Sequence, residues 1–495
     1  MSKPTGTQDG NQRDLAAMLV LVEQLRPALQ NDDRQGQVSA IRRLVDLRAP
    51  MGEQWRSLAG LAARNGELSL ARQAIDLFVE VCGDTALARY MKAALLEQCG
   101  LYREAHELVR TLPADVPDRA SYAYSRGTVA LYLGLMEEAR EHLSTAVRLQ
   151  PQMGQAWLSL MFASDLRSDK ALVHAVVSAE RAMDRVPPAQ RAPYLYALGQ
   201  ALAAEGDHAG AFRAFERGGQ DVKSGTSYQP DADRRGMMES LHGFDAASIR
   251  SVAGGQDQPT GRAMFVTGLP RAGTTLVQQA LTRHGGVGGG AEMNLLMQLA
   301  REIGGHSSEA VVRRVQVKGA ADLARLWEHL LQERFPGSGR IVDKSLNTSR
   351  FMGLAAALLP DAPLVWITRD PLDQAWSCFR TYFRAGQEWS SDLGDIAHHF
   401  RLEDELLRRW QDILGERLLV VPYAALVEDF PGWMGRIAAH CGLTLETAML
   451  SPHENEAVVP TASVAQVRRP VNREGLGVAE PYREFLEPFV SAYAA

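Results

Sequence analysis

Cysteine is scarce in this sequence, and its four cysteines, Cys82, Cys99, Cys378 and Cys441, are too far apart to form a CxxC pair. Neither a disulfide framework nor a zinc site is therefore indicated. The chain also lacks an uncharged apolar run of membrane-spanning length, and its start lacks the apolar core of a secretory signal. Neither sign of charge dominates, because the formal net charge is only -6. The chain as a whole therefore has no general attraction for nucleic acid or anionic lipid. We expect a cytoplasmic protein with no membrane or nucleic-acid partner and a disordered start, residues 1–13.

A lysine is missing where a phosphate-binding loop would normally carry one. Residues 265–275 follow an apolar run, with Gly268 and Gly273 at the two glycine positions of the GxxxxGK(S/T) motif and Thr274 at the lysine position. A nucleotide triphosphatase needs that lysine and magnesium to neutralise the β- and γ-phosphates. We therefore expect a different phosphorylated donor, no metal, and a loop in which backbone N–H groups and Arg271 bind the anion. The alternative is a glycine-rich turn between a strand and a helix that binds nothing.

The first half of the sequence is helical and repetitive. Glycines recur every 34 residues, each followed five residues later by an alanine, in the pairs Gly66/Ala71, Gly100/Ala105 and Gly134/Ala139. Glycine permits a tight turn and alanine permits close helix packing, so this period is typical of tetratricopeptide repeats. Gly206 and Ala211 repeat the pattern 72 residues later. We expect an all-α solenoid of about five or six helix pairs over residues 14–218.

The role of this solenoid is open at the level of sequence. Its concave face could bind a peptide or protein, either as the acceptor of the reaction or as a partner. It could equally serve as a scaffold that orients the second domain or brings two copies together as a homodimer. Every such array buries its repeats in the same way whatever it binds, so the pattern does not separate these alternatives.

The second half of the sequence has a different pattern of secondary structure. Residues 219–257 mix turn residues with one short amphipathic segment and indicate a connector. In residues 258–495, helical stretches alternate with short apolar runs at Ala263–Val266, Arg340–Val342, Leu364–Ile367 and Leu418–Val421. This alternation predicts an α/β domain of the phosphate-loop type with a parallel sheet, whose ligands bind beyond the carboxyl ends of the strands.

A second candidate anion site follows one of these runs. The run 364–367 leads to Arg369, Pro371 can open a helix, and Ser377 lies about two helical turns further on. Arg369 and Ser377 could converge on a second anionic group. Alone, an Arg-Asp-Pro sequence after a strand is also a common capped junction.

Together, the loop at 268–275, Arg369 and Ser377 resemble the paired signatures of sulfotransferases that use 3′-phosphoadenosine 5′-phosphosulfate (PAPS). With repeats ahead of this domain, the chain is similar to bacterial tetratricopeptide repeat-containing sulfotransferases, whose catalytic domain resembles that of tyrosylprotein sulfotransferases. The resemblance implies that Arg369 and Ser377 bind the 3′-phosphate. It implies that the 5′-phosphosulfate is bound by the loop residues Arg271, Ala272, Gly273, Thr274 and Thr275.

Four more positions match this family. The resemblance implies that Glu292 is the general base, and that Lys344 and Ser463 stabilise charge on the departing adenosine bisphosphate. Ser463 begins a segment similar to the family's late Ser-x-x-Gln-Val-x-x-Pro-Val-Asn sequence, which makes Arg469 a cation that binds the donor. The chain departs from the family at Ala272, where serine is usual, and at Ala291, where glycine commonly precedes the glutamate.

The chemistry of these residues is consistent with sulfuryl transfer. Fixed arginine, lysine and backbone donors can stabilise the transferred group without magnesium, and a carboxylate can accept the proton of an attacking hydroxyl. We therefore predict a PAPS-dependent sulfotransferase whose acceptor hydroxyl belongs to tyrosine in a peptide or protein. Alternatives are a saccharide acceptor, a repeat scaffold without catalysis, and a phosphate-loop kinase, which Thr274 disfavours. His284 could replace Glu292 as base but is better placed to cap a helix, and Tyr382, Phe383 and Trp389 could line a pocket or belong to the core.

Overall fold

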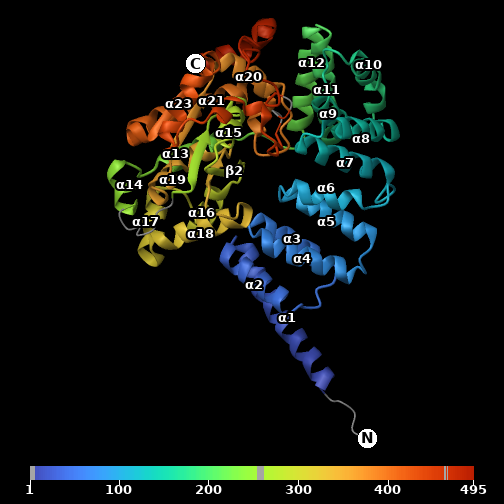
Figure 1. Cartoon of the computed structure of the whole chain (residues 1–495), viewed down its shortest axis with the longest axis vertical. Coiled ribbons are helices and arrows are strands. Elements are labelled where there is room, and N and C mark those ends of the chain that lie inside the picture. The colour runs from blue at the N-terminus through green and yellow to red at the C-terminus, as the bar shows by residue number, and fades with distance from the viewer. Residues whose placement is uncertain (1–5, 254–260, 462–463, 465) are drawn as a thin grey trace.

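The computed structural model of the protein describes residues 6–253, 261–461, 464 and 466–495, with backbone only for 6–14. The chain has two parts (Figure 1). The helical array, α1 to α12, curves from the sheet domain near α12 around to α2, which again lies close to the sheet domain. The sheet domain, residues 230–495, carries the remaining helices and all strands of the described residues. Among the described helices, none combines the length and apolar character needed to cross a membrane.

Most helices of the array pack as consecutive pairs. α1 packs against α2, α3 against α4, α5 against α6, α7 against α8, and α11 against α12. α9 packs instead against α8 and α11, in the stretch where the sequence has lost its repeat glycine. The helices are α1 (Gly6–Gln30), α2 (Arg34–Asp46), α3 (Gln54–Arg64), α4 (Leu68–Val81), α5 (Ala86–Gln98), α6 (Tyr102–Arg110), α7 (Arg119–Leu133), α8 (Met136–Leu149), α9 (Gly154–Ala163), α10 (Lys170–Ser178), α11 (Pro188–Ala204) and α12 (His208–Lys223).

The repeat glycines lie where the first helix of a pair ends. Gly66, Gly100, Gly134 and Gly206 follow α3, α5, α7 and α11 and have φ between +73° and +83°. This left-handed conformation favours glycine and ends the helix. The alanines five residues later are fully buried in the second helix, which confirms the close helix contact expected from the sequence.

The start of the chain and the connector differ from the expectation. α1 begins at Gly6, so backbone helix covers part of the segment expected to be disordered, and residues 1–5 lie outside the described residues. The expected connector 219–257 contains the end of α12 and two helices, α13 (Pro230–Leu241) and α14 (Ala246–Ala253). Met237, Ile249 and Val252 of these helices are buried in the core of the sheet domain. Burial of these few side chains stabilises helices that the turn-rich composition did not suggest.

The sheet is wholly parallel, with strand order β2-β3-β1-β4-β5. The strands are β1 (Ala263–Thr267), β2 (Val287–Ala291), β3 (Arg340–Asp343), β4 (Leu364–Thr368) and β5 (Leu418–Pro422). The four apolar runs of the sequence form β1, β3, β4 and β5, as expected. The edge strand β2 was not expected, because three of the five residues in its sequence Val-Gly-Gly-Gly-Ala are glycines, which are typical of turns.

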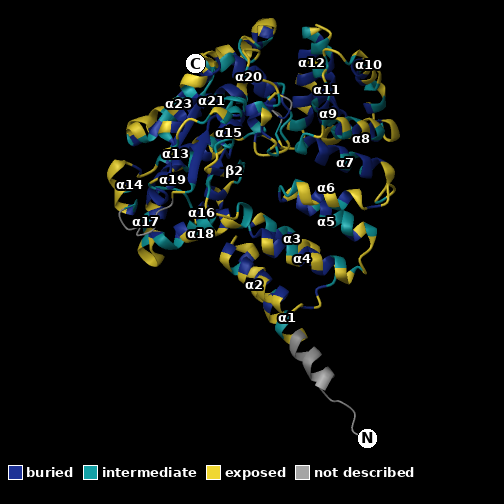
Figure 2. Cartoon of the chain, viewed as in Figure 1, coloured by how far each residue is buried: buried dark blue, intermediate teal, exposed yellow. Residues whose placement is uncertain are grey.

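Alternate strand residues enter two separate cores. Phe265, Leu364 and Trp366 pack under α13, α14, α16 (Leu295–Ile303), α18 (Ala320–Arg334), α19 (Met352–Leu358) and α21 (Leu393–Leu414). Val266 and Ile367 pack on the opposite face under α15 (Thr274–Leu281), α22 (Tyr423–Glu428) and α23 (Phe430–His440). Both faces are therefore covered, and β1, β3 and β4 are largely buried (Figure 2). The remaining helices are α17 (Ser308–Lys318), α20 (Pro371–Phe379) and α24 (Glu487–Ala494).

The array and the sheet domain share one hydrophobic core where α12 meets α20. Phe212 of α12 stacks on Phe379 of α20 and on Phe485, with ring centroids 5.4 and 4.9 Å apart. Phe215 makes an edge contact with Trp376, 5.6 Å away. These buried aromatic pairs fix the last helix pair of the array against the sheet domain.

Candidate active site

The phosphate loop leads from β1 into the N-terminus of α15. Gly268, with φ +143°, lies so close to β4 that a β-carbon would be 2.4 Å from the Ile367 carbonyl oxygen. Gly273, with φ +107°, leaves no room for a β-carbon beside the Tyr423 ring, 2.5 Å away. Both glycines are therefore required for a loop that turns tightly and presents its backbone to the start of the helix.

A cavity of about 310 Å³ lies beside this loop, and we call it the donor pocket after the ligand that the sequence analysis expects there. Gly273, Thr274 and Thr275 line it on the loop side. Ala272 does not, because its side chain is in the core and its N–H donates to the Leu269 carbonyl. Ala272 therefore offers no group to a ligand, unlike its neighbours in the loop.

Arginine side chains dominate the charge of this pocket. Arg271, Arg369, Arg380 and Arg469 all line it, and the carboxylate among its lining residues, Glu474, is paired with Arg469 at 2.9 Å. Burial, with the nearby guanidinium groups of Arg380 and Arg369, lowers the pKa of Arg271 to about 10. Arg271 remains a cation at neutral pH, but burial and repulsion from the neighbouring guanidinium groups raise the free energy of its charged form. An anionic ligand would relieve that cost.

Arg369, which follows β4, donates hydrogen bonds to two segments that border the pocket. Arg369 Nη1 donates to the Arg271 carbonyl at 2.8 Å, and Nη2 donates to the Gly475 carbonyl. Its guanidinium also lies 5.3 Å from the centre of the Tyr423 ring. Ser377, 2 % exposed on α20, lines the same pocket. The structure thus brings together the two motifs that the sequence predicted to converge.

A segment that we call the strap, residues 466–475, forms the outer wall of the donor pocket. Gln466 accepts a 2.7 Å hydrogen bond from Arg271 Nη2, which ties the strap to the phosphate loop. Arg469, expected to bind the donor, lies on the strap and lines the pocket. Ser463, the third predicted catalytic residue, lies outside the described residues.

The predicted base and lysine form an ion pair at the ends of two neighbouring strands. Glu292 follows β2, Lys344 follows β3, and Lys344 Nζ donates to Glu292 Oε1. The lysine side chain is 3 % exposed and the glutamate 32 %. Both charges are thus paired, and Glu292 remains open to solvent.

A second cavity, about 390 Å³, lies on the side of the loop that carries this ion pair, and we call it the acceptor pocket. Thr274 and Thr275 line both pockets, so the start of α15 separates them. Tyr382 and Phe383 line the acceptor pocket, whereas Trp389 stacks on His399 at 4.4 Å outside it. The array supplies another wall, through Tyr132, Gln155, Leu158, Ser159 and Phe162.

The strand ends also explain how the ion pair is held. Lys344 N donates to the Ala291 carbonyl at 3.0 Å, which fixes the two strand ends side by side. Ser345 donates its N–H and hydroxyl to Asp343, and its hydroxyl oxygen accepts the Asn294 N–H at 2.7 Å. Burial raises the pKa of Asp343 to about 6.

His284, the alternative base considered from the sequence, lies away from both pockets and pairs with Glu446 at 3.3 Å.

Sequence reasoning missed two residues that belong to the site. Arg380, which ends α20, lines the donor pocket one turn after Ser377. Tyr423 begins α22 directly after β5 and fills the space between Gly273 and Gly475. Its position at the carboxyl end of a strand was the available signal, because every other strand in the sheet also ends at a site residue.

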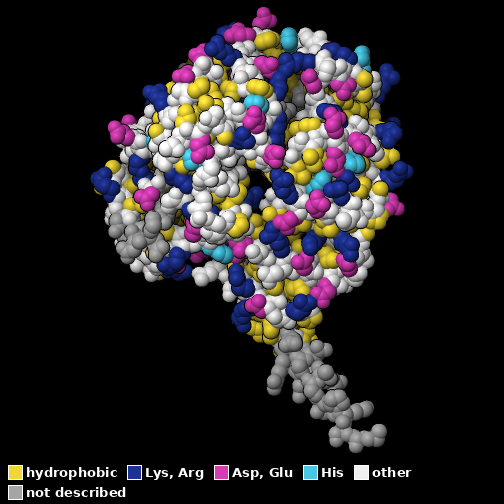
Figure 3. Space-filling view, viewed as in Figure 1, with side chains coloured by type: hydrophobic (Ala, Val, Ile, Leu, Met, Phe, Trp, Pro, Cys, Tyr) yellow, Lys and Arg dark blue, Asp and Glu magenta, His cyan; other side chains and the backbone are white. Residues whose placement is uncertain are grey.

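A third cavity, about 510 Å³, lies between the array and the strap. It combines apolar side chains, such as Met161 and Phe215, with guanidinium groups, such as Arg167 and Arg468. Figure 3 shows Lys and Arg side chains along the groove between the array and the sheet domain. The positive charge of the site therefore lies where the two parts of the chain meet.

Comparison with known proteins finds a family similarity within the sheet domain. A family model described as "Sulfotransferase family" matches residues 263–447. This match covers the phosphate loop, Glu292, Lys344, Arg369 and Ser377 and ends before the strap. Residues 263–447 are therefore similar to the sulfotransferase family, which supports the prediction of a sulfotransferase enzyme.

A curated relative and two solved structures are also similar. An uncharacterized protein of Aquifex aeolicus (strain VF5) is 24% identical over 417 residues, which are 81% of this chain and 54% of that protein. This chain thus spans about half the length of the curated relative. The sulfotransferase domain of the Synechococcus PCC 7002 olefin synthase is 17% identical, covering 48% of this chain and 97% of that domain, with a TM-score of 0.30. Sulfotransferase STF9 from Mycobacterium avium is 17% identical, covering 62% and 97%, with a TM-score of 0.29.

Proposed function

We propose that the chain is a PAPS-dependent sulfotransferase that transfers a sulfuryl group to the hydroxyl of tyrosine in a peptide or protein. One observation carries the proposal. A pocket rich in arginine and a pocket with a Glu–Lys pair lie on either side of the same phosphate loop and share Thr274 and Thr275. A donor in the first pocket and an acceptor in the second would meet at the start of α15.

The donor pocket fits an adenosine bisphosphate with two anionic ends. Loop amides at the N-terminus of α15 suit the 5′ end, and Arg369 with Ser377 suit the 3′-phosphate. The cavity of about 310 Å³ is within the range of ligand pockets. The sulfotransferase-family match to these residues supports the same donor.

The acceptor pocket supplies the groups that transfer needs. Glu292 would accept the proton of the acceptor hydroxyl as its oxygen bonds to sulfur. The bond between sulfur and the 5′-phosphate oxygen would break, leaving its electron pair on that oxygen, where a lysine such as Lys344 stabilises charge. Tyr132, Phe162 and Phe383 line the pocket and favour an aromatic acceptor over a saccharide.

The helical array would belong to the tetratricopeptide class and present protein acceptors or a partner. The spacing of 34 residues and the helix pairs support this assignment. An array that lines the acceptor pocket would act directly on acceptor choice. A scaffold without catalysis would have no need of the Glu292–Lys344 pair.

The proposal is tested with radiolabelled PAPS, supplied with p-nitrophenol, a tyrosine peptide or an oligosaccharide. We expect transfer to the phenol and the peptide, and Glu292→Gln should lower kcat by about two to four orders of magnitude. Calorimetry should show unchanged binding of adenosine 3′,5′-bisphosphate by this variant. Glu309→Gln, an exposed glutamate on α17, serves as control and should leave activity intact.

Three outcomes would contradict parts of the proposal. Full activity of Glu292→Gln would remove this residue from the role of base. Transfer to the oligosaccharide alone would change the acceptor class. The absence of adenosine 3′,5′-bisphosphate binding by the wild-type protein would favour the scaffold.

A further inference from the structure

One edge of the array, which we call the glycine edge, carries Gly66, Gly100 and Gly134 and faces the sheet domain. A methyl group at Gly66 would lie 2.9 Å from Leu330, and one at Gly100 would lie 2.2 Å from Arg334 Nη2. A methyl group at Gly134 would lie 3.0 Å from Arg468 Nη2. Gly206 differs, since nothing lies within 4 Å of a methyl group there. Three of the repeat glycines therefore do more than end a helix, because they also permit the sheet domain to approach.

The contact at Gly134 involves the arginine that anchors the strap. The Arg468 guanidinium donates to the carbonyl of Asn455 and, at 2.8 Å, to that of Ala457. It thereby fixes the chain before the strap to the strap itself. Beside it, Val459 N donates to the carbonyl of Tyr132 in α7 at 3.1 Å. The end of α7 and the turn at Gly134 thus form the surface on which this anchor rests.

The opposite side of the strap faces the donor pocket. Gln466 and Arg469, on either side of Arg468 in sequence, line that pocket, and Gln466 accepts a hydrogen bond from Arg271 of the phosphate loop. At the far end of the strap, the Gly475 carbonyl accepts from Arg369. The strap therefore lies between the array on one side and the two donor-binding motifs on the other.

We propose that the helical array positions the donor site, with Gly134 and Arg468 as the positioning residues that hold the strap against the phosphate loop. The proposal rests on the proposed function, because it assigns the bound molecule as adenosine 3′,5′-bisphosphate or its sulfated form. It gives the array a role in donor binding, beyond its wall of the acceptor pocket. Neither positioning residue lines the donor pocket, so both act through Gln466 and Arg469.

The chain offers a matched pair of variants for the test. Gly134→Asn and Gly206→Asn replace glycines with nearly equal φ, +80° and +83°, so both carry the same backbone strain. Asparagine tolerates this conformation better than most residues. Only the side chain at position 134 would meet Arg468. Any difference between the two variants therefore reports the contact with the anchor of the strap.

We expect Gly134→Asn to bind adenosine 3′,5′-bisphosphate about tenfold more weakly than Gly206→Asn, since displacement of Arg468 frees two carbonyls and loosens Gln466. In steady-state assays with PAPS and p-nitrophenol, KM for PAPS should rise and kcat should change little. Arg468→Ala should weaken binding similarly, and Arg468→Lys, which keeps the charge and a single donor nitrogen, should restore part of the affinity. A purely structural role would lower thermal stability without this separation of KM from kcat.

Hydrogen exchange provides a readout that does not depend on the donor. Backbone amides of residues 466–475 should exchange faster in Gly134→Asn than in Gly206→Asn, whether or not nucleotide binds. Equal exchange and equal affinity in the two variants would overturn the positioning role. If the wild type binds no adenosine 3′,5′-bisphosphate but the strap still exchanges faster in Gly134→Asn, the coupling holds and the proposed donor is wrong.

Discussion

Arg380 shows how a single side chain can mark an anion site. Its guanidinium lies at the end of α20, borders the donor pocket and the cavity under the array, and is 5.9 Å from the Trp376 ring centre. Burial lowers its pKa. Within the described part of the chain, no carboxylate forms an ion pair with it. A guanidinium withdrawn from water without a counter-ion is best explained by an anionic ligand.

Replacement of Arg380 by methionine should therefore weaken binding of adenosine 3′,5′-bisphosphate by about tenfold or more, because a charge-assisted contact to phosphate is lost. Arg483→Met removes the same charge from an exposed side chain, 64 % exposed, and serves as control. Calorimetry at low and high salt measures the effect, and the salt dependence should decrease in Arg380→Met only. Equal affinities in the two variants would place Arg380 outside the donor site.

Sequence reasoning found most residues of the site but not this one. Glu292, Lys344, Arg369 and the phosphate loop follow strands and match family motifs, so their convergence could be predicted. Arg380 follows a helix, and its proximity to Arg271 depends on how α20 packs on the loop, where Gln374 donates to the Leu269 and Pro270 carbonyls at 3.1 Å. Tertiary packing of this kind leaves no local pattern in the sequence.

At the scale of elements, the glycines of β2 have a packing role. A methyl group at Gly290 would lie 3.0 Å from Val342 and 3.2 Å from Gln278, and one at Gly289 would lie 2.6 Å from Phe335. Gln278 also donates to the Gly290 carbonyl at 2.9 Å. The strand can therefore pair with β3 only if these positions carry no side chain. This requirement explains why the edge strand that leads to Glu292 has the glycine-rich sequence of a turn.

Gly290→Ala should push β2 away from β3 and separate Glu292 from Lys344. Gly288→Ala is the matched control, because its methyl group would meet Ile341 at an ordinary 3.4 Å. We expect Gly290→Ala to lower kcat with p-nitrophenol at least tenfold and to destabilise the fold by about 1–3 kcal/mol, with donor affinity unchanged. Thermal unfolding and calorimetry separate these effects. The same kcat in both variants would show that β2 does not set the distance between the two charges.

Which elements could be predicted depends on where their information lies. The helix pairs follow from glycine and alanine spacing, and β1, β3, β4 and β5 follow from buried apolar runs. The strand β2 and the helices α13 and α14 owe their structure to neighbours rather than to their own composition. The glycine edge of the array carries both kinds of information, and only the turn could be inferred from the repeat.

At the scale of the whole molecule, the array touches the sheet domain at both ends. Near α12 the contact is the shared aromatic core. Near α2 to α5 it is polar, since Arg301 pairs with Asp32, Gln298 donates to the Arg64 carbonyl at 2.9 Å, and Arg334 donates to the Cys99 carbonyl at 2.9 Å. Donors from the sheet domain thus cap the C-terminal ends of α3 and α5. The array therefore curves around the side of the sheet domain that holds the acceptor pocket (Figure 1).

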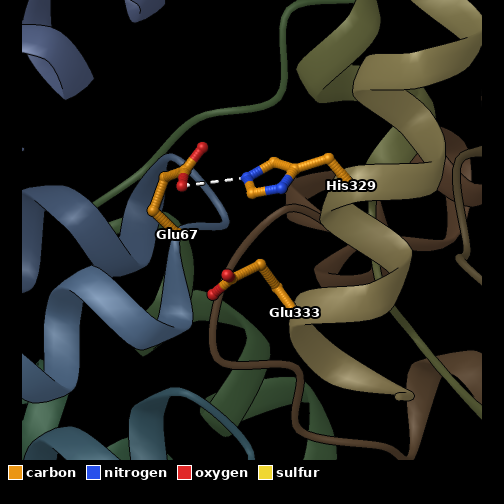
Figure 4. A group of neighbouring side chains, drawn as sticks. All are labelled: Glu67, His329 and Glu333. Atoms are coloured by element: carbon orange, nitrogen blue, oxygen red, sulfur yellow. Dashed lines mark hydrogen bonds and ion pairs between the residues drawn. The ribbon is translucent and has the colours of Figure 1, made fainter. Parts of the chain in front are cut away.

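An ion-pair network around the buried side chain of Glu67 joins the same surfaces. Figure 4 shows Glu67, which precedes α4, bonded to His329 of α18, with Glu333 nearby; the Glu67–His329 distance is 3.0 Å. These three side chains are close enough to hold a metal ion. Arg34 and Arg42 already pair with Glu67, however, at 2.6 and 3.2 Å. Glu333 accepts the Ser69 N–H near the start of α4 at 2.5 Å. The group is therefore an interdomain network of ion pairs and hydrogen bonds.

This network predicts that docking of the array depends on pH. The hydrogen bond and charge of Glu67, with Glu333 adding and burial and Arg34 opposing, raise the pKa of His329. Burial opposes the shift of Glu67, but His329 and Arg34 lower its pKa. The contribution of His329 is complete below its unfolded pKa, about 6.5, and is lost as pH rises through its raised folded pKa. The contribution of Glu67 is present above about 4.3 and is lost as pH falls through its lowered folded pKa. The pair therefore stabilises docking most between these two values.

The prediction is tested by comparing the wild type with His329→Gln, which keeps a hydrogen-bond donor but cannot become charged. Because His329 is 42 % exposed, we expect the wild type to be more stable by only about 0.5 kcal/mol near pH 5.5, with the difference vanishing at alkaline pH. Urea unfolding across this range measures the difference, and amide exchange around Ser69 reports whether α4 separates from α18. A double-mutant cycle with Glu67→Gln isolates the pair from the arginines. A stability difference that stays constant with pH would show that the array is held by its arginine contacts alone, so that protonation of His329 plays no part in closing the molecule.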